Sequence, residues 1–457
     1  MAHLTDKCPL SGDSTPRAVT VRRVDRLSRV LNTDASGEAG GTVTTTSSGI
    51  TVSCRLCGST DVRSFCDLGA TPPCELFLTA ETAERPEPTY PLHVRVCNAC
   101  LLAQLPPEIS PEETFSEYAY FSSFSSSWVE HARRFVDAAQ ERAGLTGDSF
   151  VVEVASNDGY LLQHVVGKGI RCLGVEPSVN VGEAAREKGV PTLTAFLTPE
   201  TGARVRAEHG PADLVCGNNV FAHIPDVVGF ARGLRAMVAD DGWVSIEVQH
   251  LLTLVERKQF DTIYHEHFQY YTLLTGQRAL AAGGLTLVDV ELLDTHGGSI
   301  RMWARPDAAA GEPSATVREV LAAEGVAGLH TPEGHDGFAE AVSTIRDDLV
   351  SFLIDARRQG KRVVGYGAPG KGNTLLNYCG IRPDLLAYTV DRNPYKHGRL
   401  TPGTRIPVHA PERIAQDRPD YVLVLPWNLR TELTEQLSYV HEWGGRLVYP
   451  IPSLEVV

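Results

Sequence analysis

The sequence predicts an α/β protein with a small N-terminal zinc-binding module, a central Rossmann-like sheet and a C-terminal Rossmann-like α/β domain. Two observations predict this class. Apolar strand patterns such as FVVEVAS and WVSIEVQ alternate with amphipathic helical patterns from Ser149, and a second alternation starts near residue 360. Two CxxC pairs, CRLC and CNAC, precede both alternations. Apolar strands alternating with amphipathic helices are typical of a parallel sheet covered on both faces.

The length predicts several domains, because 457 residues exceed what one compact core usually contains. Residues 1–48 are rich in Ser, Thr, Gly and Arg and have no hydrophobic period, so we expect a disordered arm. The expected modules after it are 49–110 for the four-cysteine unit, 111–308 for the central sheet and 309–457 for the C-terminal domain.

Composition excludes some functions. The formal net charge is −14 and no basic run stands out, which argues against nucleic-acid binding. No apolar stretch approaches the roughly 18–20 residues that span a bilayer, and the N-terminus lacks a secretory pattern. We therefore expect a cytoplasmic protein without a membrane partner, in which thiols stay reduced and ten cysteines need a reason other than disulfides.

The two CxxC pairs indicate a structural zinc site. Cys54 and Cys57 form the first pair, and 39 residues separate Cys57 from the second pair, Cys97 and Cys100. Two residues between thiolates let one turn aim both sulfurs at a tetrahedral ion, and four thiolates close the site to catalysis. The alternative is a set of buried or redox cysteines, although a redox CxxC normally stands alone.

A cofactor site is predicted where the first strand of the alternation turns into its helix. The motif EVASNDGYLL supplies Asn157, Asp158 and Gly159 for a tight turn with exposed amides. Glu176 ends the second strand, where an acid typically accepts hydrogen bonds from ribose hydroxyls. The first turn lacks the GxGxxG of dinucleotide enzymes. The alternative is an unspecialised strand–turn–helix.

These residues resemble the S-adenosylmethionine-dependent sugar C-methyltransferases, which methylate dTDP-linked 4-keto-deoxysugars on the way to antibiotic branched sugars. Besides the CxxC pairs, the matching motifs are EVASNDGYLL, GVEPS, GNNVFAHIPD, TIYHEHFQYY, HGGSIR, VGYGAPGKGNTLLN, DRNPYKHGRLTPGTRIPV and VLPWN. The arm before residue 50 has no counterpart in that pattern. The resemblance implies that S-adenosylmethionine and Zn²⁺ are the cofactors. The cofactor residues would be Glu153, Ser156, Asn157, Asp158, Gly159, Glu176, Pro177, Asn218 and Asn219.

The motif TIYHEHFQYY supplies candidates for proton transfer, which methylation beside a ketone requires. By resemblance, His267 is the base that takes the α-proton, and Tyr264 and Glu266 line the same pocket. His223 would lie near the sugar, and Tyr118 would contact substrate. Asn218 and Asn219 would hold the enolate oxygen or the methionine moiety. A metal site at HEH is the alternative, but no third ligand is evident.

The motif GYGAPGKGN opens the second alternation with a GxGxxG spacing and a lysine. Lys371 supplies positive charge for a phosphate at a helix N-terminus. By resemblance, this domain holds the nucleotide-sugar diphosphate; the candidate contacts are His296, Gly367, Lys371, Asn373, Asp391, Arg392, Lys396 and Arg399. Two alternatives stay open here: a nicotinamide-dependent oxidoreductase, and a degenerate Rossmann scaffold.

The resemblance favours methylation at C-3 of the sugar, with C-5 as the alternative, because a 4-ketone activates both neighbours. A hypothesis of a different class is a zinc-dependent nucleic-acid or protein-binding module fused to degenerate Rossmann folds. The sequence leaves the sugar and the oligomeric state open.

Overall fold

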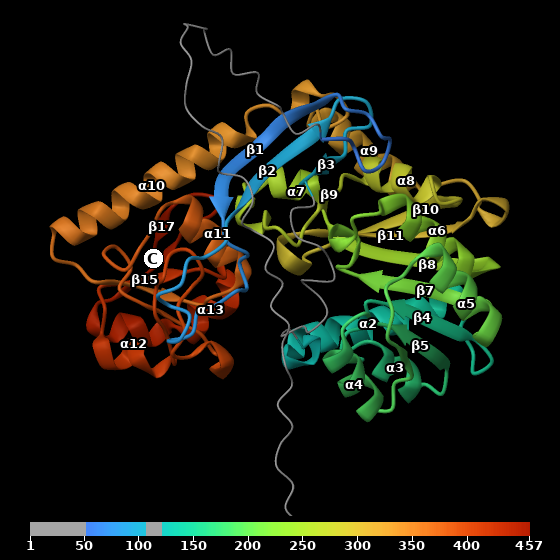
Figure 1. The fold of residues 1–457 in the computed structure, drawn as a ribbon, viewed down its shortest axis with the longest axis horizontal. Coiled ribbons are helices and arrows are strands. Elements are labelled where there is room, and N and C mark those ends of the chain that lie inside the picture. Colours follow the sequence, from blue (N-terminus) through green and yellow to red (C-terminus); the bar gives the residue numbers. More distant parts are fainter. Residues whose placement is uncertain (1–51, 107–120) are drawn as a thin grey trace, which may run out of the picture. The chain divides into compact units, whose positions relative to one another are not determined.

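The computed structural model describes residues 52–106 and 121–457. All of them belong to one compact unit, Thr51–Val457. The predicted disordered arm and Tyr118 lie outside the described residues. Three sheets organise the unit, and their order along the chain confirms the predicted α/β class (Figure 1).

The zinc module is built on a four-stranded antiparallel sheet with the order β1-β2-β3-β9. Its strands are β1 (Val62–Thr71), β2 (Tyr90–Cys97), β3 (Ala103–Gln104) and β9 (Gln269–Tyr270). The last strand comes from a segment far along the chain, directly after the HEHF motif. Pairing of Ala103 with Tyr270 therefore ties the candidate base, His267, to the zinc module.

The central sheet has seven strands in the order β10-β11-β8-β7-β4-β5-β6. They are β4 (Phe150–Val154), β5 (Arg171–Val175), β6 (Thr192–Leu193), β7 (Ala212–Asn218), β8 (Val238–Gln249), β10 (Leu285–Leu293) and β11 (Ser299–Pro306). Strands β4 to β8 pair in parallel, whereas β11 joins β8 and β10 joins β11 antiparallel. The order reverses between β4 and β7, which places the crevice for a ligand at their carboxyl ends.

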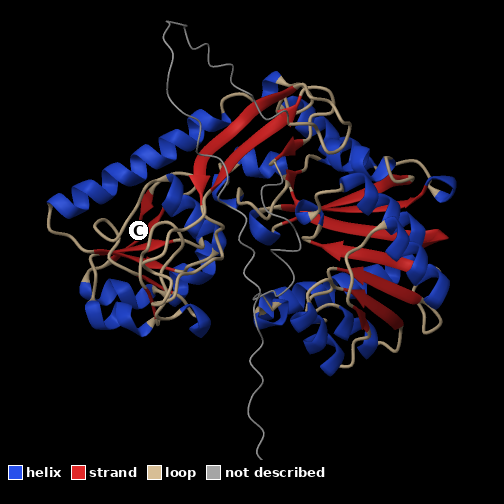
Figure 2. Cartoon of the chain, in the orientation of Figure 1, coloured by secondary structure: helices blue, strands red, loops and turns tan. Residues whose placement is uncertain are grey.

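Helices cover both faces of the central sheet (Figure 2). They are α2 (Ser126–Ala143), α3 (Leu162–Gly167), α4 (Val179–Glu187), α5 (Pro199–His209), α6 (Val227–Met237) and α8 (Leu273–Ala281), whereas α7 (Leu251–Glu256) packs Leu251 and Leu254 in the core that includes the zinc-module sheet. Successive residues of β4 point to opposite faces. Val151 therefore packs in one core cluster with α2 and α3, and Val152 packs in another with α6 and α8.

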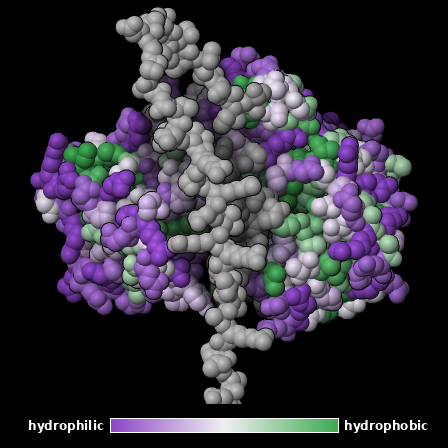
Figure 3. Space-filling view, in the orientation of Figure 1, coloured by the Kyte–Doolittle hydropathy of each residue, from purple (hydrophilic) through white to green (hydrophobic). Residues whose placement is uncertain are grey.

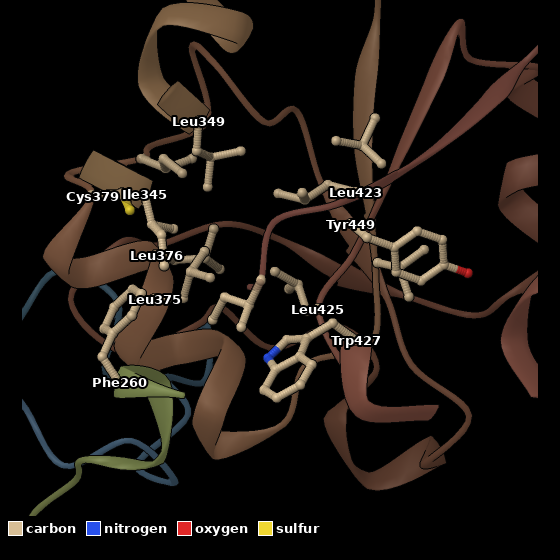
Figure 4. Close-up of a cluster of buried hydrophobic side chains, with 14 of the residues drawn as sticks. Phe260, Ile345, Leu349, Leu375, Leu376, Cys379, Leu423, Leu425, Trp427 and Tyr449 are labelled. Atoms are coloured by element: carbon tan, nitrogen blue, oxygen red, sulfur yellow. The ribbon is translucent and has the colours of Figure 1, made fainter. Parts of the chain in front are cut away.

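The C-terminal sheet has six strands in the order β14-β13-β12-β15-β16-β17, parallel except at β17. They are β12 (Val363–Tyr366), β13 (Thr389–Val390), β14 (Val408–His409), β15 (Tyr421–Val424), β16 (Arg446–Tyr449) and β17 (Glu455–Val456). The helices here are α10 (Phe338–Arg358), α11 (Gly370–Tyr378), α12 (Glu412–Asp417) and α13 (Arg430–Gln436), whereas α9 (Ala315–Val326) packs Val317 and Val320 into the core of the central sheet. Phe260, from the segment before the HEH motif, shares this core with Leu375 and Trp427 (Figure 4).

Two details differ from the sequence patterns. The residues VADDG belong to β8 and not to the preceding helix, because β8 starts at Val238. Helix α3 begins at Leu162, since Asn157 and Gly159 adopt positive φ angles of 49° and 76° that a right-handed helix excludes.

Among the described residues, no helix is both long and apolar enough to cross a membrane. Hydrophilic residues predominate on the described part of the face shown in Figure 3.

Candidate active site

The turn after β4 is held in shape by acidic side chains. The Glu176 carboxylate, at the end of β5, accepts the backbone N–H of Asn157 at 2.9 Å and that of Ser178 at 2.8 Å. The Ser178 side chain also hydrogen-bonds this carboxylate, so Glu176 holds together the turn at which the cofactor is predicted to bind. Pro177 follows Glu176 in the turn toward α4.

Asp158 has partners of its own. Its carboxylate accepts from Lys188 Nζ at 2.8 Å and from the Ser123 side chain. The Asn157 side-chain oxygen accepts the Ser122 N–H at 2.9 Å. The turn therefore holds the start of α2 as well as the edge of the cofactor crevice.

Buried polar side chains at the ends of β4 and β7 fit a polar cofactor. The Glu153 carboxylate and the Asn218 side-chain amide are buried. Among the described residues, the Tyr160 hydroxyl is the sole group that hydrogen-bonds either of them. Desolvation raises the pKa of Glu153 well above its usual range. Ser156 Oγ is buried without a partner among the described residues. Such orphaned groups are rare in folded proteins, and they face the crevice where a nucleoside cofactor binds in this topology.

Tyr264 and His267 meet across a β-turn. The His267 N–H donates to the Tyr264 carbonyl at 2.9 Å, and the ring centroids lie 3.9 Å apart. The intervening His265 points elsewhere: its ring lies edge-on to Tyr90, and its Nε2 is 3.1 Å from the Tyr90 carbonyl oxygen. The structure thus separates the two histidines of the HEH motif.

One hydrogen bond fixes the tautomer of His267. Its Nδ1 lies 2.9 Å from the Thr262 carbonyl oxygen, which only accepts, so Nδ1 carries the proton and Nε2 keeps its lone pair. Desolvation, followed by the nearby His223, lowers the pKa of His267 well below its usual range. The imidazole is therefore neutral and able to take a proton at neutral pH.

His223 stands beside His267, with 4.8 Å between the ring centroids and a 70° angle between the planes. Desolvation lowers its pKa to about 4. Two uncharged imidazoles from different loops therefore line one side of the crevice.

Glu266 is a protonated acid at neutral pH. Desolvation, and then the charge of Glu75, raises its pKa to about 8. Because the Glu75 side chain keeps 45% of its surface exposed, water screens part of its charge and desolvation is the larger cause. Glu75 was not among the sequence-predicted residues, since nothing local links the PPCEL segment to the HEH motif.

The raised pKa of Glu266 predicts a basic limb in the pH–rate profile. Above about pH 8 the carboxyl ionises and places negative charge where an anionic enolate would form, so kcat falls as the pH rises. Glu266→Gln removes this limb. Glu75→Gln moves it to lower pH, because the charge that raises the pKa is gone. An unchanged limb in Glu266→Gln would assign it to another group.

A buried ion cluster supports the end of β8. Glu247 accepts from His131 Nε2 at 2.8 Å, from Arg301 Nη2 at 2.7 Å and from Thr295 Oγ1 at 2.8 Å. Although desolvation raises it, the hydrogen bond from His131 and the charge of Arg301 bring the pKa of Glu247 to about 2. A glutamate inside the apolar strand VSIEVQ was the one sequence signal for this cluster.

Arg301→Met is expected to lower the free energy of unfolding by about 3–5 kcal/mol, because it strands the buried Glu247 carboxylate. Arg133→Met is the matched control: its partners Glu130 and Asp137 are about half exposed, so water screens both pairs and the loss should be far smaller than for Arg301→Met. Urea denaturation measures both. Equal losses of unfolding free energy in the two variants would show that burial does not make the Arg301–Glu247 pair more important than an exposed pair.

The four cysteines of the CxxC pairs come together as predicted. Their sulfurs lie within 4.8 Å of one another, with 3.4 Å between those of Cys54 and Cys100 and 3.6 Å between those of Cys57 and Cys97. Tetrahedral zinc–sulfur bonds of about 2.3 Å require sulfurs about 3.8 Å apart, so the cluster fits Zn²⁺. Arg55, within the first pair, donates to the carbonyls of Leu105 and Pro225 and links the knuckle to the loop that contains His223.

The glycines of the C-terminal GxGxxG are explained by packing. A Cβ on Gly367 would lie 2.6 Å from Pro426, and one on Gly370 would lie 2.9 Å from Cys74 Sγ and from a Glu75 oxygen. The N-terminus of α11 thus faces the protein's own carboxylate, Glu75. Lys396 lies 3.5 Å from the same carboxylate.

The remaining predicted substrate contacts differ in their surroundings. Asn373 donates to the Cys74 carbonyl at 2.7 Å, and the Asp391 carboxylate accepts the N–H of Ala368 at 2.7 Å, so both hold the loop. Arg392 and Arg399 are exposed. His296 adopts a φ of 53°, and its ring lies edge-on to Trp128 at 4.8 Å.

Comparison with known proteins identifies the class. Three family matches run along the chain: a putative zinc binding domain (54–115), a methyltransferase domain (128–290) and a C-methyltransferase C-terminal domain (294–452). The chain belongs to the C-methyltransferase family. Among its relatives, C-methyltransferase NovU of Streptomyces niveus is 38% identical over 404 residues, covering 88% of this chain and 96% of NovU.

The protein is therefore an S-adenosylmethionine-dependent C-methyltransferase with zinc at its four-cysteine site. This excludes the alternative of a binding module fused to degenerate Rossmann folds. Solved structures overlap it in part. Magnesium protoporphyrin IX methyltransferase of Synechocystis PCC 6803 with bound SAH has a TM-score of 0.32 at 16% identity, covering 39% of this chain and 84% of that one. A methyltransferase of Anabaena variabilis has a TM-score of 0.32 at 13% identity, covering 38% and 84%. These scores are too low to bear on function.

Proposed function

We propose that the enzyme methylates the carbon beside the ketone of a dTDP-4-keto-deoxysugar, at C-3, in the biosynthesis of an antibiotic sugar. The geometry of His267 is the observation that supports this most directly: a neutral imidazole, oriented by Thr262, presents an unprotonated Nε2 to the crevice. Removal of a proton beside a ketone needs such a base. The motif resemblance supports the nucleotide sugar as the substrate class.

In this mechanism His267 takes the α-proton, and Tyr264 and His223 hold its ring from two sides. Tyr264 also relays or returns a proton. S-adenosylmethionine supplies the electrophilic methyl group, and Glu153, Ser156, Asn157, Asp158, Gly159, Glu176, Pro177, Asn218 and Asn219 hold it. Protonated Glu266 donates a hydrogen bond without adding negative charge to the crevice. Tyr118 contacts the sugar.

The C-terminal domain binds the nucleotide diphosphate through its cationic surface. Arg392 and Arg399 are exposed, with Arg392 3.9 Å from the Glu432 carboxylate at the surface, and both follow β13, the strand beside the glycine-rich loop. Gly367, Asn373 and Asp391 shape that loop. A nicotinamide cofactor is disfavoured because the glycines of GxGxxG pack against Pro426 and Glu75.

Two measurements test the proposal. Calorimetry should detect S-adenosylmethionine binding at micromolar affinity, and no detectable binding would contradict the cofactor assignment. Mass and NMR analysis of products from a panel of dTDP-4-keto sugars should then locate the new methyl group at C-3. Methylation at C-5 would establish the alternative position, and no methylation of any panel member would exclude this substrate class.

A further inference from the structure

Lys371 reaches from α11 toward the catalytic crevice. Its Nζ donates to the backbone oxygen of His296 at 3.0 Å and lies 5.9 Å from the centroid of the Trp427 ring. An ammonium has three N–H groups. Within the described residues the structure gives Nζ this one hydrogen-bond acceptor, so two N–H groups stay available for a ligand.

The charges around Lys371 show what it faces. Asp261 is the acidic group that interacts with it, and one oxygen of that carboxylate accepts the Trp427 indole N–H at 2.6 Å. On the other side, the positive charge of Lys371 contributes to the lowered pKa values of His267 and His296. Hydrogen bonds also connect the ammonium to the proposed base: Gln249 donates to the same His296 oxygen at 3.3 Å and accepts from Thr262 Oγ1 at 2.7 Å, and the Thr262 carbonyl oxygen lies 2.9 Å from His267 Nδ1.

We propose that the Lys371 ammonium stabilises the enolate oxygen that forms when His267 removes the α-proton. This inference rests on the function proposed above. In this step the C–H bond breaks, its proton goes to His267 Nε2, and the electron pair forms a carbon–carbon double bond while the carbonyl π pair moves to oxygen. A cation already in place beside the carbonyl lowers the energy of that oxyanion.

The same contacts disfavour a phosphate role for Lys371. The N-terminus of α11, where a phosphate would bind, faces the Glu75 carboxylate. Lys396 accompanies that carboxylate at 3.5 Å. A diphosphate at this N-terminus would lie beside the Glu75 carboxylate, which disfavours its binding there. The nucleotide is left to the exposed arginines, Arg392 and Arg399.

The test compares Lys371→Met, which keeps length and removes charge, with Lys371→Arg, which keeps charge. Wild type and variants are incubated with a dTDP-4-keto sugar and S-adenosylhomocysteine in deuterated water, and mass spectrometry follows deuterium entry at the α-carbon. We expect Lys371→Met to slow both this exchange and kcat by about 10²–10³-fold, with KM for the sugar within about threefold of wild type. Lys371→Arg should retain part of the rate.

A second readout is the pH profile, which a purely structural role would not move. His267 faces His223, His296, Tyr264, Tyr270, Glu266 and Lys371. Removing the Lys371 charge raises the pKa of His267, so the acid limb of kcat/KM moves to higher pH in Lys371→Met. Lys371→Gln gives the same shift if the methionine variant does not fold.

The results distinguish a failure of the role proposed for Lys371 from a failure of the proposed function. A rise in KM of tenfold or more, with exchange and kcat unchanged, would overturn this role and indicate that Lys371 binds the diphosphate instead. Wild-type protein that shows neither exchange nor methyl transfer with any panel sugar would instead overturn the proposed function itself.

Discussion

Replacing His267 with asparagine is expected to reduce kcat by about 10²–10⁴-fold, the usual contribution of a positioned general base. The asparagine amide can still donate to the Thr262 carbonyl, which His267 Nδ1 does at 2.9 Å, so the turn should keep its shape. What disappears is the Nε2 lone pair. Steady-state kinetics measures the loss, and calorimetry should show unchanged S-adenosylmethionine binding.

His441→Asn is the matched control for this prediction. That ring also hydrogen-bonds a backbone carbonyl through Nδ1, at 3.1 Å from the Gly445 oxygen, but it lies at the C-terminal sheet. Its activity should equal that of wild type. If His267→Asn lost cofactor binding together with turnover, the residue would have a folding role. If it kept a tenth of the rate, another group would be the base.

Removing the zinc is expected to produce the largest loss of stability. A structural zinc site contributes about 10–16 kcal/mol to folding in small domains, and here it fixes both ends of the β2–β3 segment. Strand β3 pairs with β9, two residues after His267. Cys97→Ser should therefore abolish metal binding, lower the melting temperature and cause most of the activity to be lost. Metal analysis and calorimetric melting measure the first two effects.

Cys379→Ser provides the comparison, because Cys379 is a buried thiol outside the four-cysteine cluster. It should retain zinc and most of the activity. Zinc-free protein with wild-type melting behaviour would mean that the site does not support the fold. Zinc-free protein that melts early yet methylates at the normal rate would separate the metal from the placement of His267.

The repeated strand–helix pattern predicted both doubly wound sheets because residues buried on both faces of a parallel sheet must be apolar throughout. FVVEVAS (150–156) and WVSIEVQ (243–249) both meet that requirement, each within a single short segment of the chain. The antiparallel strands β10 and β11 were not predicted as part of the central sheet, since their pairing with β8 depends on contacts between distant segments.

The density of groups in TIYHEHFQYY predicted a catalytic segment but not the geometry of its members. Tyr264 and His267 share a pocket through a β-turn, while His265 turns to Tyr90 of the zinc module. The direction of each side chain follows from where β9 pairs. No spacing within the motif contains that information.

The sequence by itself determined the features that are local. The two CxxC spacings specified the zinc site, because a few adjacent residues contain the necessary geometry. The cofactor turn at EVASNDGYLL stays a prediction of the same local kind. Only the tertiary structure brought Glu75 to Glu266, Arg301 to Glu247, and Lys371 to the His296 turn. Each of these contacts joins segments far apart in the chain, and their interaction depends on how the sheets fold and pack together.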